Sequence, residues 1–222
     1  MNNQVISTIE ARHCKRSFLK KNVPVEVVKK VLESASNAPS SKNTQPWRVA
    51  VLTGQTLKNL SDAMVSKFDQ AQYEKPDYQY TTDPISDTFR NRARACGFAL
   101  FDLKGIDRNN RDQRREHDRQ NFLFFGAPME ILFFLPKNSE RGNFLDMGFF
   151  MQNVMLGLLS NGISSCPQFS IAEYPDTIRK TIQIEPDWWV VSGLACGYAD
   201  DNKINTFIPK RLELNEYASF YE

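Results

Sequence analysis

Ala38-Pro39-Ser40-Ser41-Lys42-Asn43-Thr44-Gln45-Pro46-Trp47 is the segment of this 222-residue chain that indicates its fold class most clearly. Upstream of it, apolar residues recur on one face of a segment from about Pro24 to Asn37, which predicts an amphipathic helix. Downstream, Trp47 to Leu52 is typical of a β-strand. The quoted stretch is therefore a loop that leads from a helix into a strand, and its small polar side chains favour hydrogen-bonded turns.

Further helices and strands alternate along the rest of the chain. The expected helices cover about 5–12, 57–68 and 144–160, and the expected buried strands cover 127–135 and 188–194. This alternation indicates an α+β protein (an α/β sandwich), with one central sheet flanked by helices and one long central helix. The sequence has no linker or internal repeat, so residues 1–222 are expected to form a single domain.

The composition argues against several classes of protein. The formal net charge is only +2, which makes no broad electrostatic case for binding nucleic acid or an anionic membrane. No apolar run approaches the roughly 20 residues that span a bilayer, and the N-terminus lacks the pattern of a signal peptide. The four cysteines are scattered without a CxxC pair, so no metal site is expected. These features favour a cytoplasmic protein.

Two middle segments are irregular or highly charged. Residues 72–90 are rich in tyrosine, proline and aspartate, which predicts an irregular excursion. Residues 107–120 mix arginines with acids, as is typical of a solvated helix face. The alternative is that these arginines contact a phosphate backbone, in a non-enzymatic nucleic-acid-binding module. The interleaved acids would repel such a polyanion.

Arg12-His13-Cys14-Lys15-Arg16 gathers cationic and hydrogen-bonding groups just after the first short helix. Arg12 and Arg16 are four residues apart, so they can share a helix face or flank a bend. Two guanidiniums held together repel each other unless an anion lies between them, and a phosphate monoester satisfies both. His13 can donate to the same group. The alternative to phosphate binding is that the whole cationic cluster faces solvent.

Together the two motifs resemble the N-terminal signature of the nitroreductase family, and Asn121 to Pro128 resembles its nitrobenzoate-reductase-like branch. The resemblance implies a mostly antiparallel central sheet and FMN bound between the subunits of a homodimer. It places Arg12, His13 and Cys14 near the phosphate arm and Arg16 near the flavin pyrimidine edge. Cys14 stands where the family usually has serine, so a hydroxyl contact becomes a weak thiol contact.

The resemblance also implies further cofactor contacts. The loop residues Pro39, Ser40, Ser41 and Asn43 would reach the flavin of the neighbouring subunit, and Ser165, Cys166 and Pro167 would pass the flavin near N5. Lys210 and Arg211 would close on the phosphate. Phe124 and Phe125 are candidate walls of the substrate pocket, with core packing an equal interpretation. No catalytic side chain is expected, because the flavin carries the chemistry.

The function implied is an FMN-dependent oxidoreductase that passes hydride from NAD(P)H through flavin N5 to an electron-poor aromatic or quinone, in a ping-pong cycle. Flavin reductase or reductive dehalogenase activity on the same fold is an alternative. Residues of about 72–125 would form a variable excursion that shapes the substrate opening. The tail, about 205–222, would dock on the partner subunit.

Overall fold

Four strands form one antiparallel sheet in the computed structural model, which describes residues 4–81 and 84–222. The strand order is β1-β2-β4-β3. The strands are β1 (Arg48–Thr53), β2 (Met129–Pro136), β3 (Ser164–Gln168) and β4 (Trp188–Gly197). All of β2 except Pro136 is buried, because it pairs on both sides and helices cover both of its faces. The predicted α+β class and central antiparallel sheet are confirmed.

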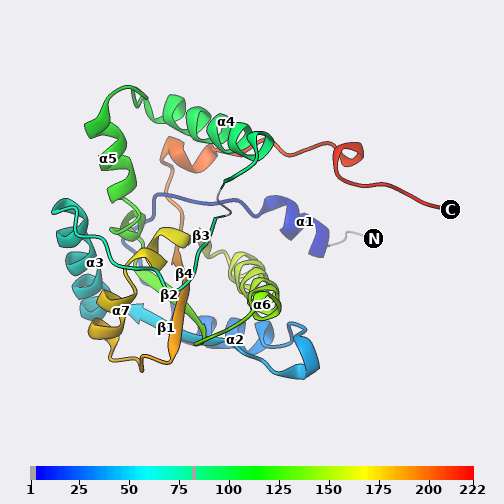
Figure 1. The fold of residues 1–222 in the computed structure, drawn as a ribbon, viewed down its shortest axis with the longest axis horizontal. Coiled ribbons are helices and arrows are strands. Elements are labelled where there is room, and N and C mark those ends of the chain that lie inside the picture. Colours follow the sequence, from blue (N-terminus) through cyan, green and yellow to red (C-terminus); the bar gives the residue numbers. More distant parts are fainter. Residues whose placement is uncertain (1–3, 82–83) are drawn as a thin grey trace.

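Helices cover both faces of this sheet (Figure 1). The helices of the described residues are α1 (Gln4–Ala11), α2 (Val25–Ala35), α3 (Gly54–Asp69), α4 (Asp87–Lys104), α5 (Arg111–Arg119), α6 (Arg141–Ser160) and α7 (Pro175–Ile182). Side chains alternate between the faces of a strand, so Ile131 and Phe133 pack in the cluster with α2 and α6, while Leu132 and Phe134 pack in the cluster with α3 and α7. The core thus has two apolar layers, one on each side of the sheet.

The long central helix, expected over about 144–160, begins three residues earlier as α6. Glu140 and Asn143 form a capping box there, and the Glu140 amide donates to Asn143 Oδ1 at 3.0 Å. Most of one side of α6 is buried, yet Leu145 and Phe149 are exposed. In the part of the chain that the structure describes, no helix combines the length and apolar character needed to cross a bilayer.

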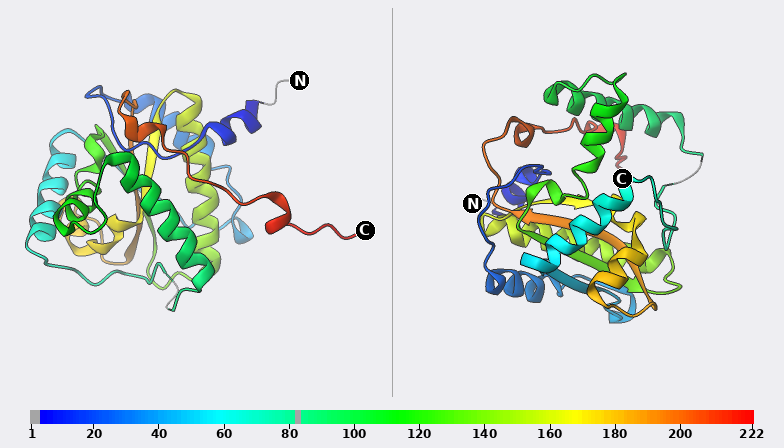
Figure 2. Two further views of the ribbon diagram at one scale, coloured as in Figure 1. Left: turned by 90° about the horizontal axis from the view of Figure 1, so that it is seen from above. Right: turned by 90° about the vertical axis from the view of Figure 1, so that its left-hand side faces the viewer.

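The segment expected to be irregular is anchored to the body at several points. Glu74 accepts a hydrogen bond from the Asp176 amide at 2.8 Å, and Tyr78 Oη donates to the Val191 carbonyl at 2.6 Å. The irregular prediction for residues 72–90 was wrong at its end, because Ser86 caps a helix that starts at Asp87. This helix, α4, and the following α5 stand away from the sheet (Figure 2).

Candidate functional site

The segment Arg12–Phe18 crosses the end of the sheet and is held there by backbone contacts. The Lys15 amide donates to the Ser165 carbonyl at 3.1 Å, which ties the segment to β3. The Arg16 amide donates to Asn205 Oδ1 at 2.8 Å. Asn205 is buried although it is polar, because its side chain is used in such contacts. The segment is therefore a fixed platform for its cationic side chains.

Neither arginine of this segment forms an ion pair with a carboxylate anywhere in residues 4–81 and 84–222. The charges of Arg16 and Arg12 instead act on the neighbouring thiol of Cys14, whose pKa they help to lower. Guanidiniums that are fixed without a carboxylate partner favour an anion. The arrangement can therefore hold a phosphate group, in line with the charge argument from the sequence.

Arg16 also lines a cavity of about 680 Å³ between its own segment and the protruding helices. Lys104 of α4 and His117 of α5 line the same cavity, together with Phe125 and Glu116. Burial, followed by the charges of Lys104 and Arg16, lowers the pKa of His117 to about 4. His117 is therefore neutral at pH 7, and its Nδ1 accepts from Lys104 Nζ at 3.0 Å. The cavity is thus basic at its Arg16 and Lys104 side.

His13 does not point a free N–H into this site. Its Nδ1 lies 2.9 Å from the Ala11 carbonyl and so carries the proton, while Nε2 accepts from Lys15 Nζ at 2.7 Å. Lys15 Nζ also donates to the Asn205 carbonyl at 2.6 Å, and burial lowers the pKa of Lys15. The predicted contact of His13 with the phosphate remains a prediction. Lys15, for which no cofactor contact was predicted, is a further cation of the cluster.

Cys14 is a half-buried thiol beside the two arginines. Its pKa is lowered to about 5, mainly by a hydrogen bond from Cys166; burial opposes this, and the charges of Arg16 and Arg12 add to it. The hydrogen bond to Cys14, followed by burial, raises the pKa of Cys166. Cys166 therefore keeps its proton, and Cys14 is the thiolate at pH 7.

Alkylation of Cys14 by iodoacetamide is expected to increase with pH, to be half-maximal near pH 5 and to level off well before pH 9, because only the thiolate reacts. The folded-state pKa lies below the ordinary value of 9.0, so ionisation stabilises the fold. That stabilisation is complete above pH 9 and is lost as the pH falls to 5. Mass spectrometry of the Cys14 peptide measures the reaction, with Cys14→Ser as the blank. A midpoint near pH 9 would contradict the assignment.

The loop at Pro39–Trp47 is anchored to the long helix. The Ser41 amide lies 3.3 Å from Asp146 Oδ1, and the ring of Trp47 stacks on Phe150 at 4.8 Å between centroids. Pro39, Ser41 and Asn43 are exposed, and Ser40 is half-buried. Figure 1 shows this loop below α6 and the start of the Arg12–Phe18 segment above it. Within one chain, the two motifs therefore lie on different sides of α6.

The Ser165–Pro167 segment lies in β3, an edge strand that was not predicted from the sequence. Ser165 and Cys166 are buried, and a proline is tolerated because the strand pairs on one side only. Pro167 lines a second cavity, of about 630 Å³. The strand thus connects the cationic segment, through Ser165, with this second cavity.

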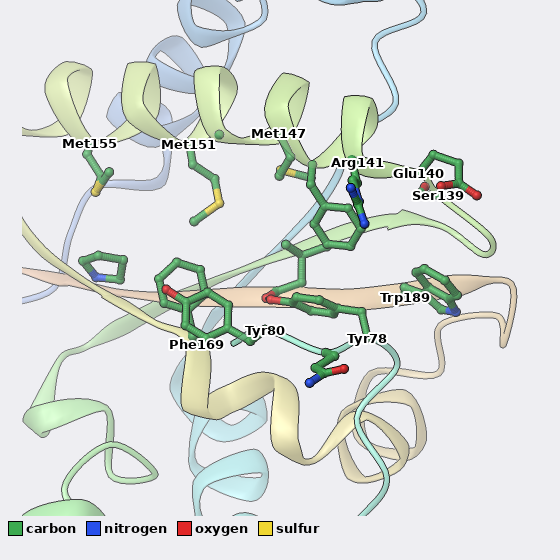
Figure 3. A pocket seen from close by; sticks show the side chains of 15 residues that line it. Tyr78, Tyr80, Ser139, Glu140, Arg141, Met147, Met151, Met155, Phe169 and Trp189 are labelled. Atoms are coloured by element: carbon green, nitrogen blue, oxygen red, sulfur yellow. The ribbon is translucent and has the colours of Figure 1, made fainter. Parts of the chain in front are cut away.

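The second cavity is lined by methionine and aromatic side chains (Figure 3). Met147, Met151 and Met155 come from successive turns of α6. Tyr80 stacks on Phe169 at 4.1 Å between ring centroids. Thioethers and stacked rings suit a planar apolar ligand. This cavity was not predicted from the sequence, although the four-residue spacing of the methionines is a visible signal.

Lys210 and Arg211 lie against α4. They line a cleft with Arg92, Ala95 and Cys96, and Arg211 Nη1 donates to the Pro209 carbonyl at 3.0 Å. Within residues 4–81 and 84–222, no hydrogen bond or ion pair joins them to Arg12 or Arg16 of the same chain. Their predicted contact with a phosphate remains a prediction.

The two candidate pocket phenylalanines have different surroundings. Both have positive φ angles, 51° for Phe124 and 53° for Phe125. Phe124 is 1% exposed and belongs to the apolar cluster next to α3. Phe125 lines the Arg16 cavity. The core-packing interpretation therefore accounts for Phe124, and only Phe125 remains a candidate wall.

A model of the nitroreductase family matches residues 9–198. This range includes the cationic segment, the Pro39–Trp47 loop and the whole sheet. The chain belongs to the nitroreductase family.

Among curated relatives, the chain is 34% identical over 214 residues to a chloronitrobenzene nitroreductase of Comamonas testosteroni, covering 96% of this chain and 94% of the relative. It is 30% identical over 196 residues to a 4-nitrobenzoate reductase of Pseudomonas putida, covering 88% and 86% of the two chains. Among solved structures, the FMN-dependent nitroreductase NfnB of Mycobacterium smegmatis in complex with NADPH is 31% identical. It superposes with a TM-score of 0.94 over 99% of this chain and 98% of the other.

Proposed function

We propose that this chain is an FMN-dependent oxidoreductase that takes electrons from NAD(P)H and reduces electron-poor aromatic compounds, nitroarenes among them, in a ping-pong cycle. Quinones are the other acceptor class. The observation that carries the proposal is that Arg12 and Arg16, on one fixed segment, have no carboxylate partner among the described residues, and that Arg16 lines a cavity. The relatives named as nitroreductases support the same assignment.

The residues present fit this cofactor. A phosphate monoester needs clustered cations, and Arg12, Lys15 and Arg16 supply them. A planar ring needs an enclosed volume, and the Arg16 cavity of about 680 Å³ lies in the range of small-molecule sites. Bound FMN supplies two-electron hydride chemistry. Arg16, held through Asn205, keeps a positive charge in the cavity and stabilises negative charge near it.

The proposal includes a homodimer with a site shared between the copies. Pro39, Ser40, Ser41 and Asn43 would act across the interface, because their loop lies on the other side of α6 from the Arg12–Phe18 segment (Figure 1). The second copy would cover the exposed apolar residues of α6, where Leu145 is 60% exposed.

The C-terminal tail and the variable excursion also have roles in the proposal. The tail, about 205–222, would dock on the partner, since Phe220 and Tyr221 are exposed and the chain end extends away from the sheet (Figure 2). The excursion of about 72–125 would shape the substrate opening. A cytoplasmic location completes the proposal.

The arginine-rich segment does not favour the nucleic-acid alternative. Arg119 of α5 forms an ion pair with Asp69 at 3.0 Å, and Arg115 donates to the carbonyls of Phe68 and Asp69. These cations therefore hold α5 against the end of α3 and are less available to a polyanion.

The test is an absorbance titration of the purified full chain after incubation with FMN and removal of free FMN. We expect flavin retained in one-to-one ratio with the chain, bleached by anaerobic NADPH or NADH and restored by a nitrobenzoate. Absence of retained flavin would overturn the proposal. Restoration by free flavin or a halogenated aromatic, but not by the nitrobenzoate, would replace the acceptor by one of the alternatives.

A further inference from the structure

Cys14 and Cys166 are neighbours in space although they are far apart in the sequence. The backbone hydrogen bond from Lys15 to Ser165, 3.1 Å long, joins the residues next to them. Both side chains pack in the same apolar cluster between the sheet and α3, and the Cys166 thiol acts on the pKa of Cys14. Of the other two thiols, Cys96 is exposed on α4. Cys196 of β4 pairs with Ser165, next to Cys166, but it is buried in the apolar cluster on the opposite face of the sheet.

The two thiols have complementary environments. Cys14 is half-buried, and the guanidiniums of Arg12 and Arg16 favour its anionic form. Cys166 is 2% exposed, and the carboxyl of the buried Glu130 acts on it from within the core. An accessible anionic sulfur beside a protected neutral sulfur is the arrangement of an attacking and a resolving thiol.

We propose that Cys14 and Cys166 form an oxidation-sensitive dithiol that hydroperoxides, hydrogen peroxide being the simplest, convert to a disulfide. With hydrogen peroxide, the Cys14 thiolate attacks one oxygen, the S–O bond forms, the O–O bond breaks, and the leaving hydroxide takes up a proton from solvent to become water. Cys166 sulfur then attacks the sulfenic acid. The S–S bond forms, the S–O bond breaks, and the departing hydroxide takes the Cys166 proton. In total, two thiols lose two electrons and two protons, and the peroxide becomes two waters.

The disulfide changes the cationic segment in two ways. It removes the anionic sulfur from beside Arg12 and Arg16, which leaves both guanidiniums available to another anion. It also joins the Arg12–Phe18 segment covalently to β3. Neither effect depends on the proposed cofactor, because both partners of the bond belong to this chain.

The experiment treats the purified full chain, with and without added FMN, with hydrogen peroxide and separately with diamide, which oxidises thiol pairs directly. Intact mass and non-reducing peptide maps are then recorded. The wild-type chain should lose two hydrogen atoms and yield a linked peptide pair that contains Cys14 and Cys166. The Cys96→Ser variant should behave in the same way, since that thiol is exposed on α4 and belongs to neither partner segment.

Two single variants separate the two roles. In Cys166→Ala, Cys14 should gain one oxygen after peroxide treatment and be captured by dimedone, because no resolving thiol is present. In Cys14→Ser, Cys166 should stay unmodified. Free thiols at both positions after both oxidants, or a link that involves Cys96 or Cys196, would overturn the proposal. Because the readout is mass, failure here is distinguishable from failure to retain flavin.

Discussion

Replacement of Arg16 with alanine is expected to weaken FMN binding roughly 10- to 150-fold. This corresponds to the loss of about 1.5–3 kcal/mol for a hydrogen bond to a charged group. The Arg16 backbone is fixed by Asn205, and its side chain lines the cavity without forming an ion pair with a carboxylate in residues 4–81 and 84–222. The contact it offers an anion is therefore preorganised. Titration of FMN into the cofactor-free variant, followed by flavin fluorescence, measures the dissociation constant.

Arg115→Ala is the matched control, because it removes the same charge from the neighbouring α5. Arg115 donates to the carbonyls of Phe68 and Asp69 and does not line the Arg16 cavity. Its loss should leave FMN affinity nearly unchanged. The Arg16 variant should also raise the pKa of His117 above its value of about 4, by removing a nearby cation, although burial remains the main cause. Equal weakening by both variants would assign the effect to overall charge and remove Arg16 from the site.

The sequence predicted those elements whose own side chains carry a strong pattern. The apolar runs that became β1, β2 and β4 and the amphipathic stripe of α2 were recognisable without tertiary information. Strand β3 was missed because Ser164-Ser165-Cys166-Pro167 has no apolar alternation and owes its strand form to pairing with β4. Helix α4 was missed because only Leu100 on it is buried, so it has no apolar face for a pattern to reveal.

The residues of the candidate site likewise fall into those that a local sequence motif predicts and those that only the tertiary structure brings together. Arg12, Arg16 and the Pro39–Trp47 loop were found because local motifs carry them. Asn205 lies 189 residues from Arg16, and nothing near it in the sequence indicates that its amide holds the Arg16 backbone. Lys104 and His117 join the Arg16 cavity only because α4 and α5 fold back over it. Contacts of this kind depend on tertiary structure, and a single sequence cannot supply them.

Replacement of Phe124 with alanine is expected to lower the free energy of unfolding by about 3–5 kcal/mol, the usual cost of removing a buried aromatic side chain. Phe124 is 1% exposed, and it packs in the apolar cluster with side chains of α3 and the sheet. Removal of its ring leaves a cavity that the surrounding elements can fill only in part. Urea unfolding of the wild-type and variant chains, followed by far-ultraviolet circular dichroism, measures the change.

Phe125→Ala is a closely matched control, because the two residues are adjacent and have nearly equal positive φ angles, 51° and 53°. The backbone strain of alanine is therefore the same in both variants. Phe125 lines the Arg16 cavity, so its truncation should cost less stability, under about 1.5 kcal/mol, and should instead raise the KM for a nitroaromatic acceptor. If Phe124→Ala proves too unstable to purify, Phe124→Leu should show a smaller loss of the same sign. A stable Phe124→Ala variant with an altered KM would return Phe124 to the pocket wall, because a side chain that supports only the core cannot change acceptor affinity without lowering stability.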